Sequence, residues 1–272
     1  MFSILRTSPT VTLRLFCCSV FLYFLILIIF YGKFRKHINM EEEKQQTINE
    51  DEMKEAGLHY GHSKTRNHPQ AGYFTVKSYT ELSFIDLEET AKALEVALDY
   101  IKEVVKKEGS ILFVGAIAGA RTKIKELAEK HGFPYVTNRW LGGTLTNFKT
   151  LNGRIKYLKE LEEKKKSGEW QKYTKHERKK LDDKMAKLEE QFIGLKNTTK
   201  LPDALFIIDP KIHDTVVREA RKIKIPMVVV LDTDDDPTLI DYPIPANDSA
   251  KSSIDYILNK VDEAIEQVKK GK

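Results

Sequence analysis

Residues 201–231 read LPDALFIIDPKIHDTVVREARKIKIPMVVVL, in which two entirely apolar runs flank a segment of helical length. The apolar runs are ALFII at 204–208 and PMVVVL at 226–231, and residues 213–224 between them are predicted as a helix. Strands that are apolar on both faces and joined by a helix are typical of a parallel sheet covered on both sides. The stretch therefore predicts a β-α-β unit of an α/β domain.

The same alternation continues on both sides of this unit. Upstream, helical spacing at 87–107 is followed by the apolar run ILFV at 111–114, a helix to residue 131 and a strand beginning at residues 135 and 136. Downstream, residues 242–245 are predicted as the last strand and residues 250–268 as the closing helix. Residues 57–147 and 201–272 together are therefore predicted to form a doubly wound three-layer α/β body, and residues 59–69 are predicted as a loop.

Residues 148–200 interrupt the alternation and predict a separate helical hairpin. Two sets of apolar residues recur at intervals of three and four, which are coiled-coil spacings. Each set makes a single apolar seam, and Ser167 and Gly168 separate the two, so we expect two antiparallel helices of about 30 Å. The first set is Phe148, Leu151, Ile155 and Leu158, and the second is Leu181, Met185, Leu188, Phe192 and Leu195.

Charge is distributed unevenly along the chain. Residues 1–39 hold five basic and no acidic side chains, which equals the whole net charge of +5, whereas residues 40–272 hold 40 of each kind. Within the second part, residues 149–200 hold 16 basic and 9 acidic side chains, a local charge of +7. One concentrated basic segment on a neutral chain indicates a local contact with a polyanion, although a solvated helical surface has the same composition.

Residues 1–39 form an apolar and basic extension that differs from the rest of the chain. Residues 15–31 carry no charge over 17 positions, the short limit for crossing a bilayer. One interpretation is a single-span anchor; the other is an over-extended reading frame whose translation starts at Met40 or Met53. Residues 40–56 follow as a polar tail and a short helix that ends at Gly57.

No catalytic constellation is present in the sequence. Residues 115–119 follow a strand but match neither the dinucleotide-binding nor the P-loop pattern, so a tight turn is predicted there. The acids of residues 232–236 are predicted as a strand-end turn with helix-capping carboxylates, because the lysine and later acids of a metal-dependent phosphatase are missing. His59, His62 and His68 make a weak metal pattern. We therefore predict no enzyme activity, no cofactor, no metal and no small-molecule substrate.

Six motifs occur along the chain in an order that resembles one family, the second protein of the bacterial small ribosomal subunit. The resemblance runs from residue 53 to about residue 268. The motifs are HYGH at 59–62, FIDLEET at 84–90, RWLGGTLTNF at 139–148, LPDALFIIDP at 201–210, REARKIKIP at 218–226 and DTDDDP at 232–237.

The resemblance implies a flavodoxin-like body bearing a coiled-coil hairpin, and a structural role in the small ribosomal subunit. The implied partners are 16S ribosomal RNA and neighbouring small-subunit proteins, including the first one, which engages messenger RNA. The RNA contacts that it implies lie in the predicted first loop and in the double-glycine motif, and charge adds three hairpin residues. These candidates are His62, Lys64, Arg66, Arg139, Asn147, Lys149, Arg154 and Lys156.

The resemblance also bears on the N-terminal extension, because a membrane anchor would oppose diffusion into an assembling RNA particle. We therefore favour initiation at Met40 and a cytoplasmic, ribosomal location, with a membrane location only if residues 1–39 are retained. Two other classes stay open: a membrane-tethered nucleotide- or phosphate-handling enzyme that uses residues 115–119 and 232–236, and a scaffold that docks protein through the hairpin.

Overall fold

The computed structural model describes residues 49–76, 79–196, 198 and 200–271. The predicted extension at residues 1–39 and the start at Met40 lie outside them. Among the described residues, no helix is both long enough and apolar enough to cross a bilayer. The compact unit that contains all of the elements below is Glu50–Lys272.

Five parallel strands form the central sheet, in the order β5-β4-β6-β7-β8. Numbered along the chain, this order is 2-1-3-4-5, the order of flavodoxin. The predicted α/β class with a parallel sheet is therefore confirmed. The strands are β4 (Ile111–Val114), β5 (Tyr135–Val136), β6 (Ala204–Ile208), β7 (Met227–Leu231) and β8 (Tyr242–Pro245).

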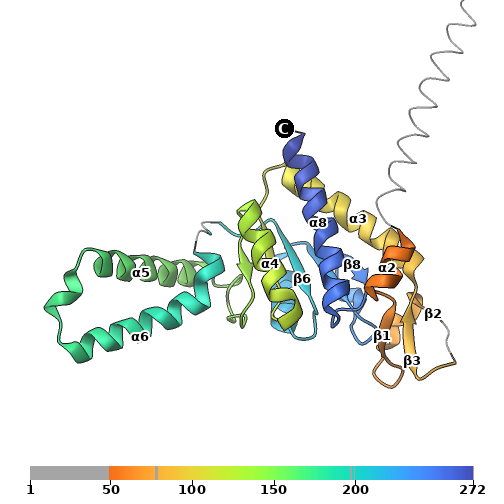
Figure 1. Ribbon diagram of the computed structural model, residues 1–272, viewed down its shortest axis with the longest axis horizontal. Coiled ribbons are helices and arrows are strands. Elements are labelled where there is room, and N and C mark those ends of the chain that lie inside the picture. The colour runs from red at the N-terminus through yellow and green to blue at the C-terminus, as the bar shows by residue number, and fades with distance from the viewer. Residues whose placement is uncertain (1–48, 77–78, 197, 199, 272) are drawn as a thin grey trace, which may run out of the picture. The chain divides into compact units, whose positions relative to one another are not determined.

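Helices cover both faces of this sheet. On one face α3 (Leu87–Lys106), α4 (Ala118–His131) and α8 (Lys251–Lys270) pack together (Figure 1). On the other face α7 (Asp214–Ile223) packs against alternate residues of the strands, including Leu205 and Ile207. All four helices lie where the sequence predicts them, and each has a buried stripe at helical spacing.

A pair of helices is inserted between β5 and β6. They are α5 (Phe148–Lys166) and α6 (Lys175–Phe192), which lie side by side and are joined through η2 (Glu169–Lys172) (Figure 1). Ion pairs join the two arms, from Lys165 to Asp182 at 2.7 Å and from Lys196 to Glu162 at 2.5 Å. The return to the body passes through η3 (Ile193–Leu195). Most of the predicted seam residues are buried, while Phe148, Leu181 and Leu188 are partly buried.

The prediction of a loop over residues 59–69 is wrong for residues 60–63, whereas residues 64–68 are turn and irregular backbone as predicted. This segment contains β1 (Tyr60–Ser63), which pairs with β3 (Leu82–Ile85) in a small antiparallel sheet completed by β2 (Thr75–Val76). A short polar strand has no clear apolar alternation, so only its neighbours reveal it. A Cβ on Gly61 would lie 2.6 Å from Thr233 Cγ2, which shows how closely β1 approaches the end of β7. The short helix α2 (Glu50–Ala56) precedes it and ends before Gly57, as predicted.

Candidate nucleic-acid interface

The double-glycine motif at 139–148 folds around one buried carboxylate, that of Glu219 on α7. Only 8% of Glu219 is exposed. The carboxylate accepts five hydrogen bonds of 2.7–3.2 Å from the motif. The motif is therefore an anion-binding loop, and the anion that it binds is the side chain of Glu219. The donors are Trp140 Nε1, the backbone N–H groups of Gly143, Leu145 and Thr146, and the Thr146 hydroxyl.

These donors keep Glu219 ionised. Burial by itself raises the pKa of this carboxyl, but the hydrogen bonds from the motif outweigh burial and hold the pKa below its ordinary value. Gly143 has a φ of +88°, a conformation that other residues adopt with strain. The sequence offered one signal for this contact, since Glu219 falls on the apolar stripe of α7 beside Val216 and Ala220.

The motif leads directly into the root of the hairpin. Arg139 is exposed, and Asn147 precedes α5 with its Oδ1 accepting a hydrogen bond of 2.8 Å from the Thr150 hydroxyl. Three further candidates, Lys149, Arg154 and Lys156, are exposed on the first turns of α5. Five of the eight predicted residues thus lie on the motif and on the first turns of α5 that follow it, and we call this segment, residues 139–156, the hairpin root.

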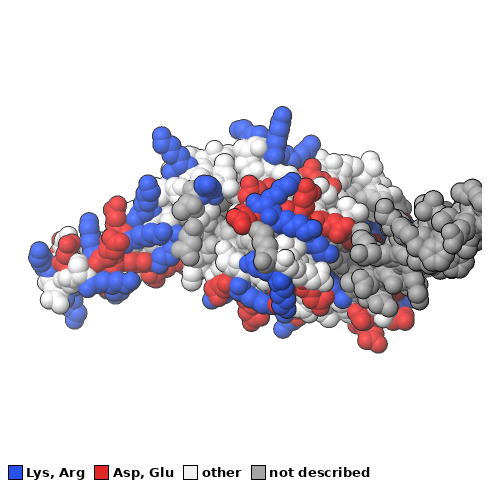
Figure 2. All heavy atoms as spheres, turned by 90° about the horizontal axis from the view of Figure 1, so that it is seen from above, with Lys and Arg blue, Asp and Glu red and all other residues white. Residues whose placement is uncertain are grey.

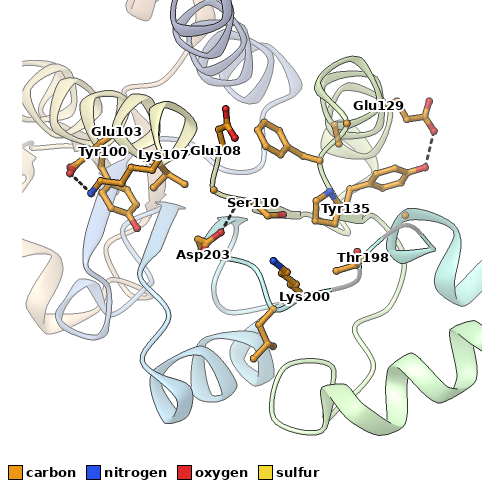
Figure 3. Close-up of a pocket in the computed structure, with 18 of the residues that line it drawn as sticks. Tyr100, Glu103, Lys107, Glu108, Ser110, Glu129, Tyr135, Thr198, Lys200 and Asp203 are labelled. Atoms are coloured by element: carbon orange, nitrogen blue, oxygen red, sulfur yellow. Dashed lines mark hydrogen bonds and ion pairs between the residues drawn. The ribbon is translucent and has the colours of Figure 1, made fainter. Parts of the chain in front are cut away.

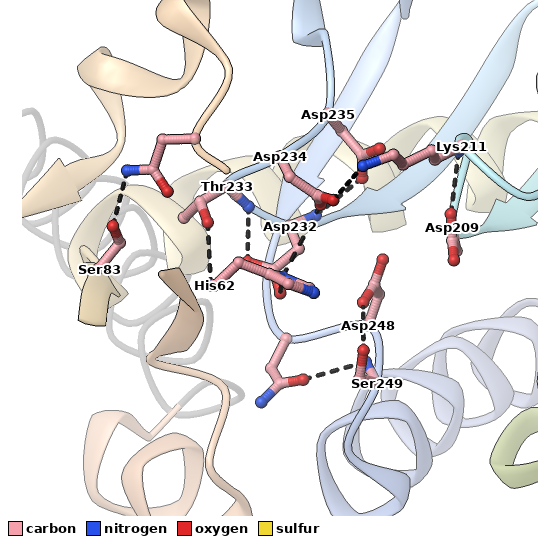
Figure 4. A network of polar contacts seen from close by, with 12 residues as sticks. His62, Ser83, Asp209, Lys211, Asp232, Thr233, Asp234, Asp235, Asp248 and Ser249 are labelled. Atoms are coloured by element: carbon pink, nitrogen blue, oxygen red, sulfur yellow. Dashed lines mark hydrogen bonds and ion pairs between the residues drawn. The ribbon is translucent and has the colours of Figure 1, made fainter. Parts of the chain in front are cut away.

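The other three candidates lie elsewhere. His62 is in strand β1 and not in a loop; its backbone N–H donates to Thr233 Oγ1 at 3.0 Å, and its Nδ1 lies 2.7 Å from Asp232 Oδ2 (Figure 4). Lys64 and Arg66 are exposed in the turn that follows. This group stands beside the end of β7, whereas the hairpin root follows β5. Strands β4 and β6 lie between β5 and β7, so the ends of β5 and β7 are about 14 Å apart at ordinary strand spacing.

The acidic run at 232–236 is a strand-end turn, as predicted. Asp236 caps the short helix η4 (Pro237–Leu239), since its Oδ1 accepts the N–H of Thr238 at 3.0 Å. Asp235 Oδ2 accepts the N–H of Asp232 at 3.1 Å. Asp234 pairs with Lys211 at 2.5 Å. The turn therefore lowers the local positive potential beside His62.

Three carboxylates gather where three strands end. They belong to Asp209 after β6, Asp235 after β7 and Asp248 after β8, and one oxygen of each lies within 4.8 Å of the others (Figure 4). Oxygen ligands of this kind suit Mg²⁺ or Ca²⁺, so these are the described residues best placed to hold a divalent cation. Burial raises the pKa of all three, to about 8 for Asp235 and about 7 for Asp248. Sequence reasoning missed Asp209 and Asp248, because only the sheet brings them to Asp235.

These raised pKa values predict a pH-dependent stability. Unfolded aspartates titrate near pH 4, so between about pH 4 and pH 8 the folded state binds more protons than the unfolded state, and the free energy of unfolding falls as pH rises. Asp235→Asn keeps an acceptor for the N–H of Asp232 but carries no charge. We expect the variant to be more stable than the parent at pH 8.5 by about 2 kcal/mol, or about 6 °C in Tm, and to gain little at pH 5.

Thermal unfolding followed by circular dichroism in EDTA checks this expectation. Asp183→Asn, at an exposed position on α6, is the control and should change Tm little at either pH. An equal gain for Asp235→Asn at both pH values would contradict the assignment of the effect to charge.

The place where a flavodoxin-like sheet binds its ligand is filled by a side chain of the chain itself. In open α/β sheets ligands bind at the carboxyl ends of the strands where the strand order reverses, here between β4 and β6. His213 is 3% exposed, and its Nε2 accepts the N–H of Ala116 at 3.0 Å. Burial lowers the pKa of His213 to about 4, so the ring is neutral and can accept. In the predicted tight turn at 115–119, the backbone N–H of Ala116 thus donates to His213 and not to a ligand. The turn gives the nucleotide-handling alternative no support.

A cavity of about 940 Å³ opens at the opposite, amino-terminal edge of the sheet (Figure 3). The rings of Tyr100 and Tyr242 stack in its wall with centroids 4.2 Å apart. Asp203 accepts the N–H of Ser110 at 2.8 Å, and the Tyr135 hydroxyl donates to Glu129 at 2.9 Å. The first of these contacts joins the starts of β4 and β6 and the second joins β5 to α4, and the lining residues contain no nucleophile paired with a base.

Comparison with known proteins agrees with the order of the motifs. The family model of ribosomal protein S2 matches residues 53–268. The small ribosomal subunit protein uS2 of Coprothermobacter proteolyticus is 39% identical over 221 residues, covering 81% of this chain and 82% of the relative. The protein of the same name from Dictyoglomus thermophilum is 42% identical over 214 residues, covering 79% and 87%. The chain therefore belongs to the ribosomal protein S2 family.

Proposed function

We propose that this chain is a non-enzymatic structural constituent of the small ribosomal subunit that binds 16S ribosomal RNA. The observation that carries the proposal is the hairpin root. The loop clamped by Glu219 holds Arg139 and Asn147 next to the first turns of α5, so several cationic and polar donors are presented from a fixed backbone. Donors of this kind suit phosphate oxygens, and phosphate contacts supply most of the affinity of such complexes.

The residues around β1, namely His62, Lys64 and Arg66, are proposed as a weaker RNA contact than the hairpin root. Lys64 and Arg66 are exposed and can contact phosphate, but the acids of the turn at 232–236 stand close to this group and oppose a polyanion. His62 is held through Nδ1 by Asp232, so we assign it the positioning of the turn that carries Lys64 and Arg66. The hairpin root is therefore proposed as the stronger contact.

Binding of the purified full chain to 16S ribosomal RNA, measured at several salt concentrations, tests the proposal. We expect the triple change Lys149→Gln, Arg154→Gln and Lys156→Gln to weaken binding about 10- to 100-fold at moderate salt and to flatten the slope of log K against log salt by about 2 to 3.

The matched control changes three lysines to glutamine: Lys92 and Lys102 on α3, and Lys107 at its C-cap. Each of these lysines is already paired with a glutamate or an aspartate of its own helix, so the control should leave RNA affinity nearly unchanged. Failure of the unaltered chain to bind the RNA would overturn the proposed function. Equal losses in both triple variants would overturn the assignment to the hairpin root.

Attachment of the first small-subunit protein is also part of the proposal, and it rests on family membership. We propose a cytoplasmic, ribosomal location on the same ground. Co-sedimentation of the first small-subunit protein with particles that contain or lack this chain checks the attachment. Loss of the first protein only from particles that lack the chain is the expected result.

A further inference from the structure

The basic charge of the hairpin is concentrated at its far end and not at the root. Residues 164–180 comprise the end of α5, the η2 turn and the start of α6, and they hold eight basic and two acidic side chains, a net charge of +6. The remaining residues of 149–200 hold eight basic and seven acidic side chains. We call residues 164–180 the hairpin tip. Figure 2 shows basic side chains around this end of the molecule.

Most of the cations of the hairpin tip are not neutralised by neighbours. Lys165 pairs with Asp182 at 2.7 Å, and Arg178 Nε donates to the carbonyl of Tyr173 at 3.1 Å. Glu177 is used within its own helix end, where its carboxylate accepts the N–H of Thr174 at 3.0 Å. Six lysines form no ion pair with another described side chain. They are Lys164, Lys166, Lys172, Lys175, Lys179 and Lys180.

The turn that carries these lysines is held by packing. Trp170 is 6% exposed and belongs to the same apolar cluster as Leu161. Lys165 Nζ lies 5.4 Å from the centre of the Trp170 ring. Gly168 takes the left-handed conformation with a φ of +75°, which lets the chain reverse after α5. A turn anchored in this way keeps its cations in place without a bound partner.

An aromatic side chain is presented among the cations. Tyr173 is 47% exposed, and every residue from 171 to 180 is exposed. Proteins that bind single-stranded nucleic acid combine cations, which follow the phosphates, with exposed rings on which bases stack. The tip offers both elements on one turn, whereas the exposed ring nearest the hairpin root, that of Tyr157, already has Lys184 Nζ 4.8 Å from its centre. An acidic protein surface would also pair with the lysines, and the test below separates it from RNA.

We propose that the hairpin tip is a second RNA-binding surface, which takes a single-stranded or looped segment different from the segment held at the hairpin root. The inference rests on the proposed function and deepens it. Lys149 and Lys166 are separated by the length of α5, about 26 Å at the ordinary helical rise. A separation of this length lets one hairpin contact two RNA elements at once, which is the arrangement that we propose.

The test compares two variants of the full chain on 16S ribosomal RNA. The tip variant carries Lys164→Gln, Lys166→Gln, Lys172→Gln and Lys179→Gln, and the root variant is the triple change described above. Glutamine keeps the helical propensity of lysine, so both variants should fold, which circular dichroism checks. We expect the tip variant to lose about 10- to 100-fold in affinity at moderate salt. In hydroxyl-radical footprints each variant should lose protection at its own separate set of nucleotides.

A further variant isolates the stacking contact. Tyr173→Ala should weaken binding to a single-stranded oligonucleotide of the tip-protected sequence about tenfold, with the salt dependence unchanged. Wild-type affinity and footprint in the tip variant, with a weakened root variant, would overturn the inference and leave the proposed function standing. Loss of the same nucleotides in both variants would also overturn it. Absence of RNA binding by the unaltered chain would overturn both. Capture of an acidic protein by the tip from ribonuclease-treated subunits, in place of RNA, would overturn the inference alone.

Discussion

Glu219→Ala is expected to destabilise the body by about 3–5 kcal/mol, the largest loss that we expect from a single polar substitution in this chain. The change removes one buried anion and leaves three backbone N–H groups and the Trp140 indole N–H without their acceptor. Each unsatisfied buried donor costs about 1–3 kcal/mol. Domains of this size have only about 5–15 kcal/mol of stability, so Tm should fall by roughly 10–15 °C.

Two further variants separate the anion from the rest of the side chain. Glu219→Gln keeps one oxygen acceptor but turns an amide toward donors, so its loss should fall between wild type and alanine. Asp214→Ala removes an exposed acid of the same helix that pairs with Arg218, and it should change stability by less than about 1 kcal/mol. Urea unfolding and amide exchange at Gly143, Leu145 and Thr146 provide the measurements. A loss below 1 kcal/mol for Glu219→Ala would mean that water replaces the carboxylate.

Gly194→Ala is expected to destabilise the chain by about 3 kcal/mol. A Cβ at this position would overlap the carbonyl oxygen of Tyr135 and lie 2.7 Å from Tyr135 Cδ2. The carbonyl is backbone of β5, so it cannot move aside without shifting that strand. Overpacking of this kind commonly costs about 1–3 kcal/mol, and more where the neighbour is rigid. The methyl group should therefore push η3 away from β5 and loosen the return of the hairpin.

The chain offers a matched control for this substitution. Gly153 lies within α5, and a Cβ there meets nothing within 4 Å. Gly153→Ala should therefore stabilise the chain by about 0.5–1 kcal/mol through helix propensity alone. Urea unfolding of both variants measures the difference. If both glycine changes shift the midpoint in the same direction, the contact between η3 and β5 does not limit stability.

The central sheet could be predicted from sequence because its information is local. ILFV at 111–114 and ALFII at 204–208 are apolar throughout, and the structure has strands with the same bounds. The strand β1 could not be found in this way, because it has no apolar alternation of its own and is formed by pairing with β3, where Tyr60 lies opposite Phe84. Periodicity describes a residue's own element, and it says little about contacts between elements.

The candidate site shows the same limit more strongly. Composition indicates that the hairpin is basic, but it does not say which lysines are already paired with acids, as Lys165 is with Asp182. The double-glycine motif is a candidate RNA contact from its sequence, yet its partner Glu219 lies more than 70 residues away. Asp209 and Asp248 meet Asp235 only at the carboxyl edge of the assembled sheet. Each of these groupings is created by the topology of the strands.

The insertion of the hairpin between β5 and β6 determines the order in which the sheet can assemble during synthesis. Strands β4 and β6 are neighbours, and the hydrogen bond between Ser110 and Asp203 at their start joins residues 93 positions apart. At about 5–20 residues per second the ribosome needs about 5–20 s to add that length. The contacts between α5 and α6 are local, so the hairpin can form on the nascent chain while β4 still lacks its central partner. That interval, when the apolar edge of β4 is unpaired, is when the growing chain most needs protection from aggregation.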